Sequence, residues 1–246
     1  MKEKDLIFGF HAIVESLRAG KPIDKIFIQR EMALAKQAPE LWHLVQEQGV
    51  TVVKVPQEKL NSLTRRNHQG IVAIASPVNF VALDNLVPVI FERGENPLIL
   101  VLDHLTDVRN FGAILRTAEC CGVHAVVIPE RGGAPVNSDA MKTSSGALNY
   151  VPICKEKNLL TAVQFLQDSG LQIVACTEKA ERTLFQLDFT LPTALIMGSE
   201  ETGIAMELLR KADVWAKIPM LGQIGSLNVS VSAGVFLYEV VRHRLG

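Results

Sequence analysis

The sequence of 246 residues is poor in cysteine and in large aromatic side chains, with four Cys, two Trp and two Tyr. Cys120 and Cys121 are adjacent, whereas Cys154 and Cys176 stand alone, so no Cys-x-x-Cys pair occurs. Structural zinc sites and disulfide-stapled scaffolds need closely and regularly spaced cysteines. We therefore expect no metal site and four reduced cysteines in apolar surroundings.

Long apolar runs and an excess of charge of one sign are also lacking. The longest apolar runs, such as residues 97–102 and 194–197, are strand-sized, whereas a membrane-spanning helix needs about 20 apolar residues. The N-terminal segment has neither the apolar core nor the small-residue cleavage site of a signal peptide. The formal net charge of −1 argues weakly against bulk electrostatic capture of nucleic acid. We expect a cytoplasmic protein without a membrane partner.

Several motifs that carry nucleotide or hydrolytic chemistry are missing. The sequence contains no GxxxxGK[ST], which excludes a P-loop nucleotide hydrolase, and no GxSxG. No GxGxxG follows the first strand expected after residue 97, and the pair Gly132-Gly133 lacks the right continuation. The six histidines form no pair with metal-ligand spacing.

What is present indicates a globular protein that forms a core, with 48% hydrophobic and 21% charged residues. Residues 1–76 carry 11 Lys and Arg against 8 Asp and Glu, whereas residues 77–246 carry 14 against 18. A mildly basic front on an acidic body is typical of an RNA-binding adjunct. Ordinary surface variation explains this difference equally well.

The alternation of apolar and turn residues predicts two domains. Residues 1–76 combine short helices and strands, including a helix over 33–48, into a small α/β unit. Residues 77–96 are expected to be a linker with a helical part over 83–92. From residue 97 to 246, strands and helices alternate, which predicts a mostly parallel sheet with helices on both faces.

Three segments of the second domain combine polar residues with strand ends. In the first, the strand ending near Asp103 leads into a helix that carries Asn110 and Arg116. Asn110 is a candidate helix cap as well as a ligand group. Arg116 lies in a small and apolar run, where a charged group needs a partner. A protein carboxylate and a substrate phosphate are equally good partners.

The second and third segments are rich in glycine. Gly198-Ser-Glu200-Glu201-Thr-Gly203 follows a predicted strand directly, either as a ligand loop or simply as a glycine-bounded turn. The stretch from Ile218 to Gly234 turns through two glycines and opens the last helix with Ser-Leu-Asn-Val-Ser. Ser226, Asn228 or Ser230 is expected to cap this helix. Ligands of parallel α/β sheets bind at such strand ends.

In this order, the three segments resemble the SpoU–TrmH branch of the SPOUT RNA methyltransferases. The shared pattern is Asn110 with Arg116, then Gly198-x-Glu200-x-x-Gly203, then Ile218-Pro-Met220 followed by Ser226-Leu227-Asn228-Val-Ser. The stretches Phe8-Gly-Phe-His-Ala-Ile13 and His68-Gln-Gly-Ile71 resemble the ribosomal-protein-like substrate-binding domain of the same family. The layout is similar to that of bacterial 23S ribosomal RNA guanosine-2′-O-methyltransferases, and the resemblance covers nearly the whole chain.

The resemblance implies a SPOUT-type α/β sheet with a C-terminal trefoil knot, S-adenosylmethionine as cofactor, and methylation of a ribose 2′-OH in ribosomal RNA. It also implies a homodimer, with the active site near the subunit interface and Asn110 contributing across it. The implied site has a catalytic and a cofactor-binding part. The catalytic residues would be Arg116, Asn110, Glu200, Ser226 and Asn228, and the cofactor-binding residues Gly198, Ile218, Leu227, Met220 and Gly203.

One departure from the family pattern and three alternatives remain. Many relatives have glycine where this chain has Glu201, which adds negative charge to the second segment. The RNA substrate is open, since transfer RNA serves some relatives. A catalytically inactive RNA-binding protein is a less favoured alternative, because Asn110, Arg116, Glu200 and Asn228 are all present. A small-molecule-binding α/β enzyme is disfavoured by the resemblance of the front domain to a ribosomal-protein-like substrate-binding domain.

Overall fold

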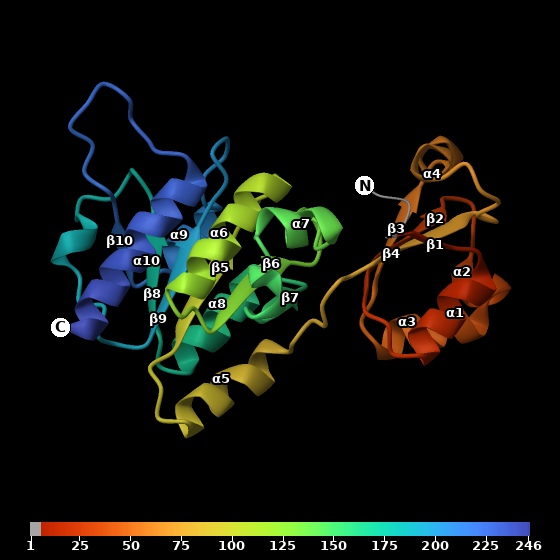
Figure 1. The fold of residues 1–246 in the computed structure, drawn as a ribbon, viewed down its shortest axis with the longest axis horizontal. Helices are drawn as coiled ribbons and strands as arrows, with labels where there is room; N and C mark the ends of the chain where they lie inside the picture. Colours follow the sequence, from red (N-terminus) through yellow and green to blue (C-terminus); the bar gives the residue numbers. More distant parts are fainter. Residues whose placement is uncertain (1–5) are drawn as a thin grey trace. The chain divides into compact units, whose positions relative to one another are not determined.

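The computed structural model describes residues 6–246, which form two compact units (Figure 1). The first comprises residues 6–79 with 135–139, and the second comprises residues 80–134 with 140–246. Each unit has its own sheet and its own core. They are therefore described separately.

The first unit has a four-stranded sheet with the order β1-β4-β2-β3. Strands β2 and β3 are parallel, whereas β4 runs antiparallel to both of its neighbours, β1 and β2. The elements are β1 (Leu6–Phe8), α1 (Phe10–Arg18), β2 (Ile23–Gln29), α2 (Leu34–Gln37), α3 (Pro39–Glu47), β3 (Thr51–Val55), α4 (Gln57–Leu63) and β4 (Ile71–Ala75).

The two faces of this sheet pack on different helices. Ile13 of α1 and Leu41 of α3 share one core with Ile26 of β2. On the other face, Leu60 of α4 packs with Val72 of β4. The alternation of buried residues along β2 between these two cores follows from the two-residue repeat of a strand.

The prediction of a single helix over residues 33–48 is wrong, because the structure has two helices there, α2 and α3. Pro39 has no N–H to donate, and Ala38 before it adopts φ −145° and ψ 69°, outside the helical region. Residues that precede proline disfavour the helical conformation for steric reasons. The chain therefore ends α2 at Gln37 and restarts with Pro39 in the first turn of α3, where a missing N–H costs little. The short β1 strand was not expected.

The second unit has a six-stranded sheet, all of it parallel, with the order β10-β8-β9-β5-β6-β7. This confirms the expected parallel α/β architecture. The elements are α5 (Leu83–Glu92), β5 (Leu98–Leu102), α6 (Val108–Cys120), β6 (Ala125–Pro129), α7 (Ser138–Thr143), the 3-10 turn Ala147–Asn149, β7 (Ile153–Glu156), α8 (Leu159–Asp168), β8 (Gln172–Cys176), the 3-10 turn Leu184–Gln186, β9 (Thr193–Met197), α9 (Met206–Lys211), β10 (Val214–Ala216) and α10 (Val229–Leu245).

Helices cover both faces of this sheet. Val87 of α5, Val163 of α8 and Leu208 of α9 pack in one core with Ile99 of β5 and Ile196 of β9. Residues 83–92, expected as part of a linker, therefore contribute to the core of the second unit. Helices α6 and α10 lie side by side (Figure 1) and bury Phe111 and Phe236.

The strand order brings three functional segments together. β9 lies between β5 and β8, with Met197 paired to Leu102 on one side and to Cys176 on the other. Because the strands are parallel, the loops that follow residues 102, 176 and 197 all leave from one edge of the sheet. Within residues 6–246, no helix has the length and apolar character needed to cross a bilayer.

Candidate functional site

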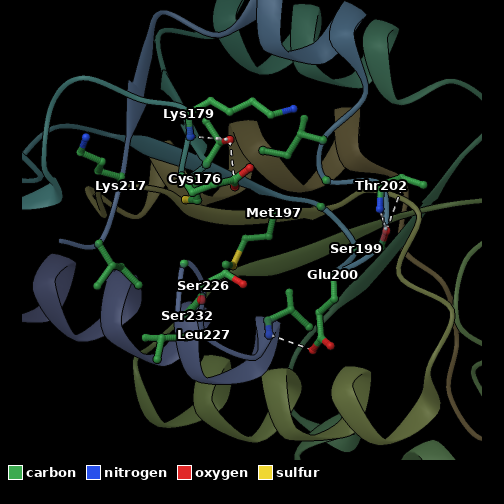
Figure 2. Close-up of a pocket in the computed structure, with 18 of the residues that line it drawn as sticks. Cys176, Lys179, Met197, Ser199, Glu200, Thr202, Lys217, Ser226, Leu227 and Ser232 are labelled. Atoms are coloured by element: carbon green, nitrogen blue, oxygen red, sulfur yellow. Dashed lines mark hydrogen bonds between the residues drawn. The ribbon is translucent and has the colours of Figure 1, made fainter. Parts of the chain in front are cut away.

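A pocket of about 450 Å³ lies at this edge of the sheet (Figure 2). It is formed by the loops after β8, β9 and β10 and by the first turns of α10. Figure 2 shows Met197 within the lining, with Glu200, Ser226 and Leu227 around it. The volume lies in the range typical of small-molecule sites, about 300–1,000 Å³. Seven of the residues expected in the site line this pocket: Gly198, Glu200, Gly203, Ile218, Met220, Ser226 and Leu227.

The loop after β9 is a tight turn closed by its two glycines. A Cβ on Gly198 would lie 2.1 Å from the carbonyl carbon of Gly203, so only glycine fits there. The backbone N–H of Gly203 donates to Ser199 O (2.9 Å), and Thr202 N donates to Ser199 Oγ (3.1 Å). The glycines thus let the chain approach itself. The turn that results projects Glu200 and Glu201 from the end of β9.

Glu200 connects three parts of the sequence. Its Oε1 accepts hydrogen bonds from Asn228 Nδ2 (2.5 Å), Val229 N (3.1 Å) and Asn110 Nδ2 (3.3 Å). Asn228 Nδ2 also lies 3.1 Å from Asn110 Oδ1. The three side chains come from α6, from the loop after β9 and from the start of α10. The two asparagine amides thus converge on one carboxylate.

Asn228 also caps α10, as one of the expected candidates. Its Oδ1 accepts from Ser230 N (2.9 Å) and Ser230 Oγ (2.5 Å). An N-cap side chain satisfies backbone donors that the helix leaves free, which is worth about 1 kcal/mol. The cap therefore fixes the Asn228 amide in place beside Glu200.

Asn110 does not cap α6, contrary to one expected role. Asp107 is the cap, since its carboxylate accepts from Arg109 N at 2.7 Å, and this hydrogen bond holds the Asp107 pKa below its ordinary value. Asn110 lies in the first helical turn, which leaves its side chain for Glu200 and Asn228. Both of these partners belong to the same chain as Asn110. The contribution of Asn110 across a subunit interface stays a prediction.

Arg116 is placed differently from the expectation. Its side chain is exposed instead of enclosed by the apolar part of α6, and it does not line the pocket. Within residues 6–246 it forms no hydrogen bond or ion pair. The reason is the helical repeat, because six residues rotate the chain by about 600°, so Arg116 leaves α6 in a direction different from Asn110.

The segment between β10 and α10 forms one wall of the pocket. Ile218, Met220, Ser226 and Leu227 line it. The middle of the segment extends from the body of the unit (Figure 1), with Leu221 fully exposed and Ile224 78% exposed. The cofactor-binding residues expected from the resemblance thus lie on two facing loops.

Sequence reasoning missed the third wall. Cys176, the last residue of β8, and the residues Thr177, Glu178 and Lys179 that follow it line the pocket, as does Lys217 after β10. Strand β8 was predicted, and the rule that ligands bind at the carboxyl ends of parallel strands would have found its loop. The sequence does not show that β8 lies beside β9, and this strand order is what places the loop after β8 at the pocket.

The cysteines differ from the expectation in part. Cys121 and Cys154 are buried, Cys176 is half-buried at the pocket, and Cys120 is exposed. Burial raises the pKa of the Cys121 thiol to about 11 and that of Cys154 to about 12. No group of three or more His, Cys, Asp or Glu side chains arranged to hold a metal ion occurs in the described part of the chain.

Each of the two units matches a known protein family. Residues 97–238 match the SpoU rRNA Methylase family, and residues 6–81 match a family described as RNA 2′-O ribose methyltransferase substrate binding. A protein of Bacillus subtilis (strain 168), placed by its name in the TrmH family of tRNA/rRNA methyltransferases, is 33% identical over 243 residues, covering 99% of this chain and 97% of that protein. A Staphylococcus aureus (strain MSSA476) protein with the same family name is 36% identical, covering 98% and 97%.

Solved structures agree with this assignment. The AdoMet-bound rRNA methyltransferase of Sinorhizobium meliloti has a TM-score of 0.63 and 25% identity, covering 98% of this chain and 88% of that one. The A. aeolicus TrmH/SpoU tRNA modifying enzyme has a TM-score of 0.56 and 32% identity, covering 66% and 84%. From the family match over most of the second unit and the full-length relatives, the chain belongs to the SpoU rRNA methylase family.

Proposed function

We propose that this protein transfers a methyl group from S-adenosylmethionine to the 2′-OH of a guanosine ribose in 23S ribosomal RNA. The observation that carries the proposal is the convergence of Asn110 and Asn228 on Glu200 beside the pocket. These residues come from the three segments that resemble the family signature. Their meeting in space supports a single site.

The lining of the pocket fits S-adenosylmethionine. Ile218, Met220 and Leu227 offer apolar contact for an adenine ring, and Glu178 and Glu200 offer negative charge for a cationic sulfonium and ammonium. When bound, the sulfonium supplies an electrophilic methyl group. We assign Gly198 and Gly203 to the shape of this wall, since they allow the tight turn after β9.

The chain itself must hold the ribose and help its hydroxyl proton to leave. We assign Asn110, Asn228 and Ser226 to orientation of the acceptor, because amide and hydroxyl groups both donate to and accept from a ribose. Glu200 Oε1 is occupied by three donors, which fixes the carboxylate and leaves Oε2 as an acceptor. A positioned carboxylate of this kind suits proton acceptance in the transition state.

We assign Arg116 to phosphate binding and charge stabilisation, not to proton abstraction. A guanidinium keeps its proton at any pH at which proteins stay folded, so it is a poor base, and Arg116 is exposed without a partner within residues 6–246. Beside the reacting hydroxyl, its charge would stabilise an alkoxide-like oxygen. Turnover of Arg116→Ala and Arg116→Lys across pH tests this role, and wild-type turnover in both variants would contradict it.

A homodimer would bring Arg116 to the pocket that its own chain does not bring it to. The exposed stripe Val231, Tyr238 and Leu245 repeats every seven residues on α10, beside α6, which carries Arg116. A helix that is apolar on more than one face usually has a second partner. We propose that this stripe pairs with a second copy and that Arg116 of the partner subunit completes the site.

The trefoil knot also belongs to the proposal. β10 lies at the far edge of the sheet beside β8, yet α10 packs against α6. The chain between them, residues 217–228, therefore crosses the same end of the sheet from which the loops after β8 and β9 emerge. Threading of this segment through a loop would fix the facing walls of the pocket.

The share of this chain that aligns with each solved structure favours ribosomal RNA over transfer RNA as the substrate. The rRNA methyltransferase of S. meliloti aligns with 98% of the chain, including the first unit, whereas two structures described as acting on tRNA align with 66% and 61%. Transfer RNA is the second candidate, since the names of the curated relatives include both substrates.

Mapping of 2′-O-methyl groups by mass spectrometry, in RNA from cells with and without this protein, tests the function. We expect one guanosine of 23S rRNA to lose its methyl group and to regain it when the pure protein and S-adenosylmethionine are added. Loss at a tRNA position instead would select the second candidate. Failure of the folded dimer to bind S-adenosylmethionine in calorimetry would contradict the enzyme itself.

A further inference from the structure

The loop between α4 and β4 presents a group of exposed polar side chains at one end of the first unit. In this loop, residues 64–70, the side chains of Arg65, Arg66, Asn67 and Gln69 are exposed, whereas Thr64 and His68 are buried. Gly70 O accepts from Gln29 N (2.9 Å), and Gly9 N donates to Ile71 O. The loop is thus adjacent to the turns that follow β1 and β2.

His68 fixes the loop from inside. Its Nδ1 accepts a hydrogen bond from Gly70 N (3.0 Å), so its Nε2 carries the proton and donates to Asn61 Oδ1 of α4 (2.9 Å). A Cβ on Gly70 would lie 2.6 Å from Met32 Cε, so the end of the loop lies close to the turn after β2. Both ring nitrogens are therefore used to set the backbone of the loop.

Gln69 is held in a conformation that it does not favour. Its φ is +52°, in the left-handed region, which costs a residue with a side chain roughly 1 kcal/mol relative to glycine. Its side-chain oxygen lies over the turn at Gly9, 3.3 Å from where a Cβ would be. Backbone strain in a loop that is otherwise fixed by hydrogen bonds is typical of a binding site.

Two arginines lie in this loop and a third follows the strand residue Gln29, whose N–H donates to Gly70 O. Arg65 forms no hydrogen bond or ion pair with another described residue. The Arg66 guanidinium lies 5.5 Å from the centroid of the Phe8 ring, which fixes it at the end of β1. Arg30 is exposed at the end of β2, and its backbone N donates to Val55 O. Cations, a fixed arginine plane and an amide that reads hydrogen-bonding edges are the components of single-stranded RNA recognition.

We propose that this end of the first unit, formed by Arg30, Arg65, Arg66 and Gln69, binds an unpaired segment of the RNA substrate. Arg65 and Arg30 contact phosphates, Arg66 offers its plane to a base, and Gln69 hydrogen-bonds to a base edge. The proposal rests on the function proposed above. It adds which surface of the first unit contacts the RNA.

Arg65→Ala tests the phosphate contact. We measure the affinity for a fluorescent fragment of the methylated rRNA by anisotropy, from 50 to 300 mM salt. The variant is expected to bind about 3- to 10-fold more weakly, with the slope of log K against log salt reduced by about 0.7, as for loss of one phosphate contact on a single strand. Lys21→Ala removes the same charge from the turn before β2, at the other end of the sheet, and should leave both quantities unchanged.

Gln69→Gly separates binding from folding. Glycine adopts the left-handed conformation without strain, so the unit should unfold at the same or a higher temperature. The affinity for RNA should nevertheless fall about 3- to 10-fold, with an unchanged salt slope, because an uncharged contact is lost. If Gln69 serves only the fold of the loop, the Gly variant will keep its RNA affinity, and the proposal fails.

The outcomes distinguish this proposal from the enzymatic one. If the wild-type protein methylates RNA but Arg65→Ala and Gln69→Gly bind it normally, the proposed surface is wrong and the function stands. If the variants bind RNA weakly, KM for RNA should rise while calorimetric binding of S-adenosylmethionine stays unchanged. Equal weakening by Arg65→Ala and Lys21→Ala would show only diffuse electrostatic attraction and would overturn the proposal.

Discussion

The side-chain amide of Asn228 donates to Glu200 Oε1 at 2.5 Å, and the backbone N–H of Val229 donates to the same oxygen at 3.1 Å. One carboxylate oxygen thus holds both the cap and the first turn of α10 against the loop after β9. Because Asn228 Oδ1 is already committed to Ser230, the orientation of its amide is determined from both sides. The last helix and the pocket wall are therefore set by the same contact.

Glu200→Gln should lower turnover about 10²- to 10³-fold, the usual effect of removing one positioned group from an active site. The amide keeps the size of the side chain but loses the charge and presents an N–H₂ to one of the three donors. The free energy of unfolding should change little, since Glu200 is exposed. Single-turnover methylation and thermal unfolding measure the two effects.

Glu207→Gln is the matched control for this substitution. Glu207 is exposed in the first turn of α9 and does not line the pocket. It should retain wild-type turnover. Equal loss of activity in both variants would contradict a specific role for Glu200.

Gly112→Ala should destabilise the second unit. A Cβ on Gly112 in α6 would lie 2.0 Å from Thr143 Oγ1 and 2.8 Å from its backbone carbonyl carbon. Relief of such an overlap requires a shift of α7 relative to α6, which costs typically 1–3 kcal/mol. Urea unfolding at constant m-value measures the loss.

Gly234→Ala makes the same chemical change in α10 with the opposite expectation. The nearest atom to the added Cβ is Thr117 Cγ2 at 3.7 Å, an ordinary contact. Alanine in a helix interior is favoured over glycine by about 1 kcal/mol. A stabilising effect at Gly112 as well would show that α6 and α7 are not packed as described.

The local pattern of apolar and turn residues predicts most of the strands and helices, but it does not predict which of them pack against each other. The strands Ile23–Gln29, Ile71–Ala75 and Thr193–Met197 were predicted at their observed bounds, because apolar β-branched runs between turn residues are distinctive. Of the candidate site, Glu200 and Asn228 could be proposed from their places at the end of a strand and the start of a helix, and the structure brings them into contact. The exposure of Arg116 and the wall after β8 depend on helix rotation and strand order, which are tertiary properties.

The contacts of Arg244, near the end of α10, could not be predicted from the sequence either. Its guanidinium donates to the carbonyl oxygens of Asn96 (2.7 Å), Pro97 (3.0 Å), Phe189 (3.2 Å) and Leu191 (3.0 Å). Two loops about 90 residues apart in sequence are thereby joined to the end of α10. Burial lowers the pKa of this guanidinium from its ordinary value, and nothing in the sequence near Arg244 indicates these partners.

Arg244→Ala should therefore lower the free energy of unfolding by about 2–4 kcal/mol, since it removes several hydrogen bonds to a charged group and leaves carbonyls unpaired. Arg244→Lys should recover only part of this loss, because an ammonium lacks the planar fork that reaches four oxygens. Arg210→Ala, at an exposed position of α9, should cost less than about 0.5 kcal/mol. Equal stability of all three variants by calorimetry would contradict the proposed anchoring.

The thiols should react in the order of their exposure. In the folded protein at pH 8, iodoacetamide should modify Cys120 first, because it is exposed, whereas burial raises the pKa of Cys121, Cys154 and Cys176 and keeps them as thiols. Peptide mass spectrometry after short labelling measures the order. Rapid labelling of Cys154 would contradict the burial of β7.

Glu239 should make the stability of the second unit depend on pH in the acid range. Its buried carboxylate receives two hydrogen bonds from Arg242 (2.7 and 2.8 Å) and lies 3.3 Å from His243 Nε2. The Arg242 hydrogen bonds hold the Glu239 pKa below its ordinary value of 4.5. A depressed carboxyl pKa stabilises the folded state above the unfolded pKa, and this contribution disappears as the pH falls through the folded pKa.

Glu239→Gln should thus be less stable than wild type at pH 7, and the difference in unfolding free energy should shrink steadily below about pH 4.5. A difference that stays constant from pH 7 to pH 3 would show that packing, and not the charge of Glu239, accounts for the effect.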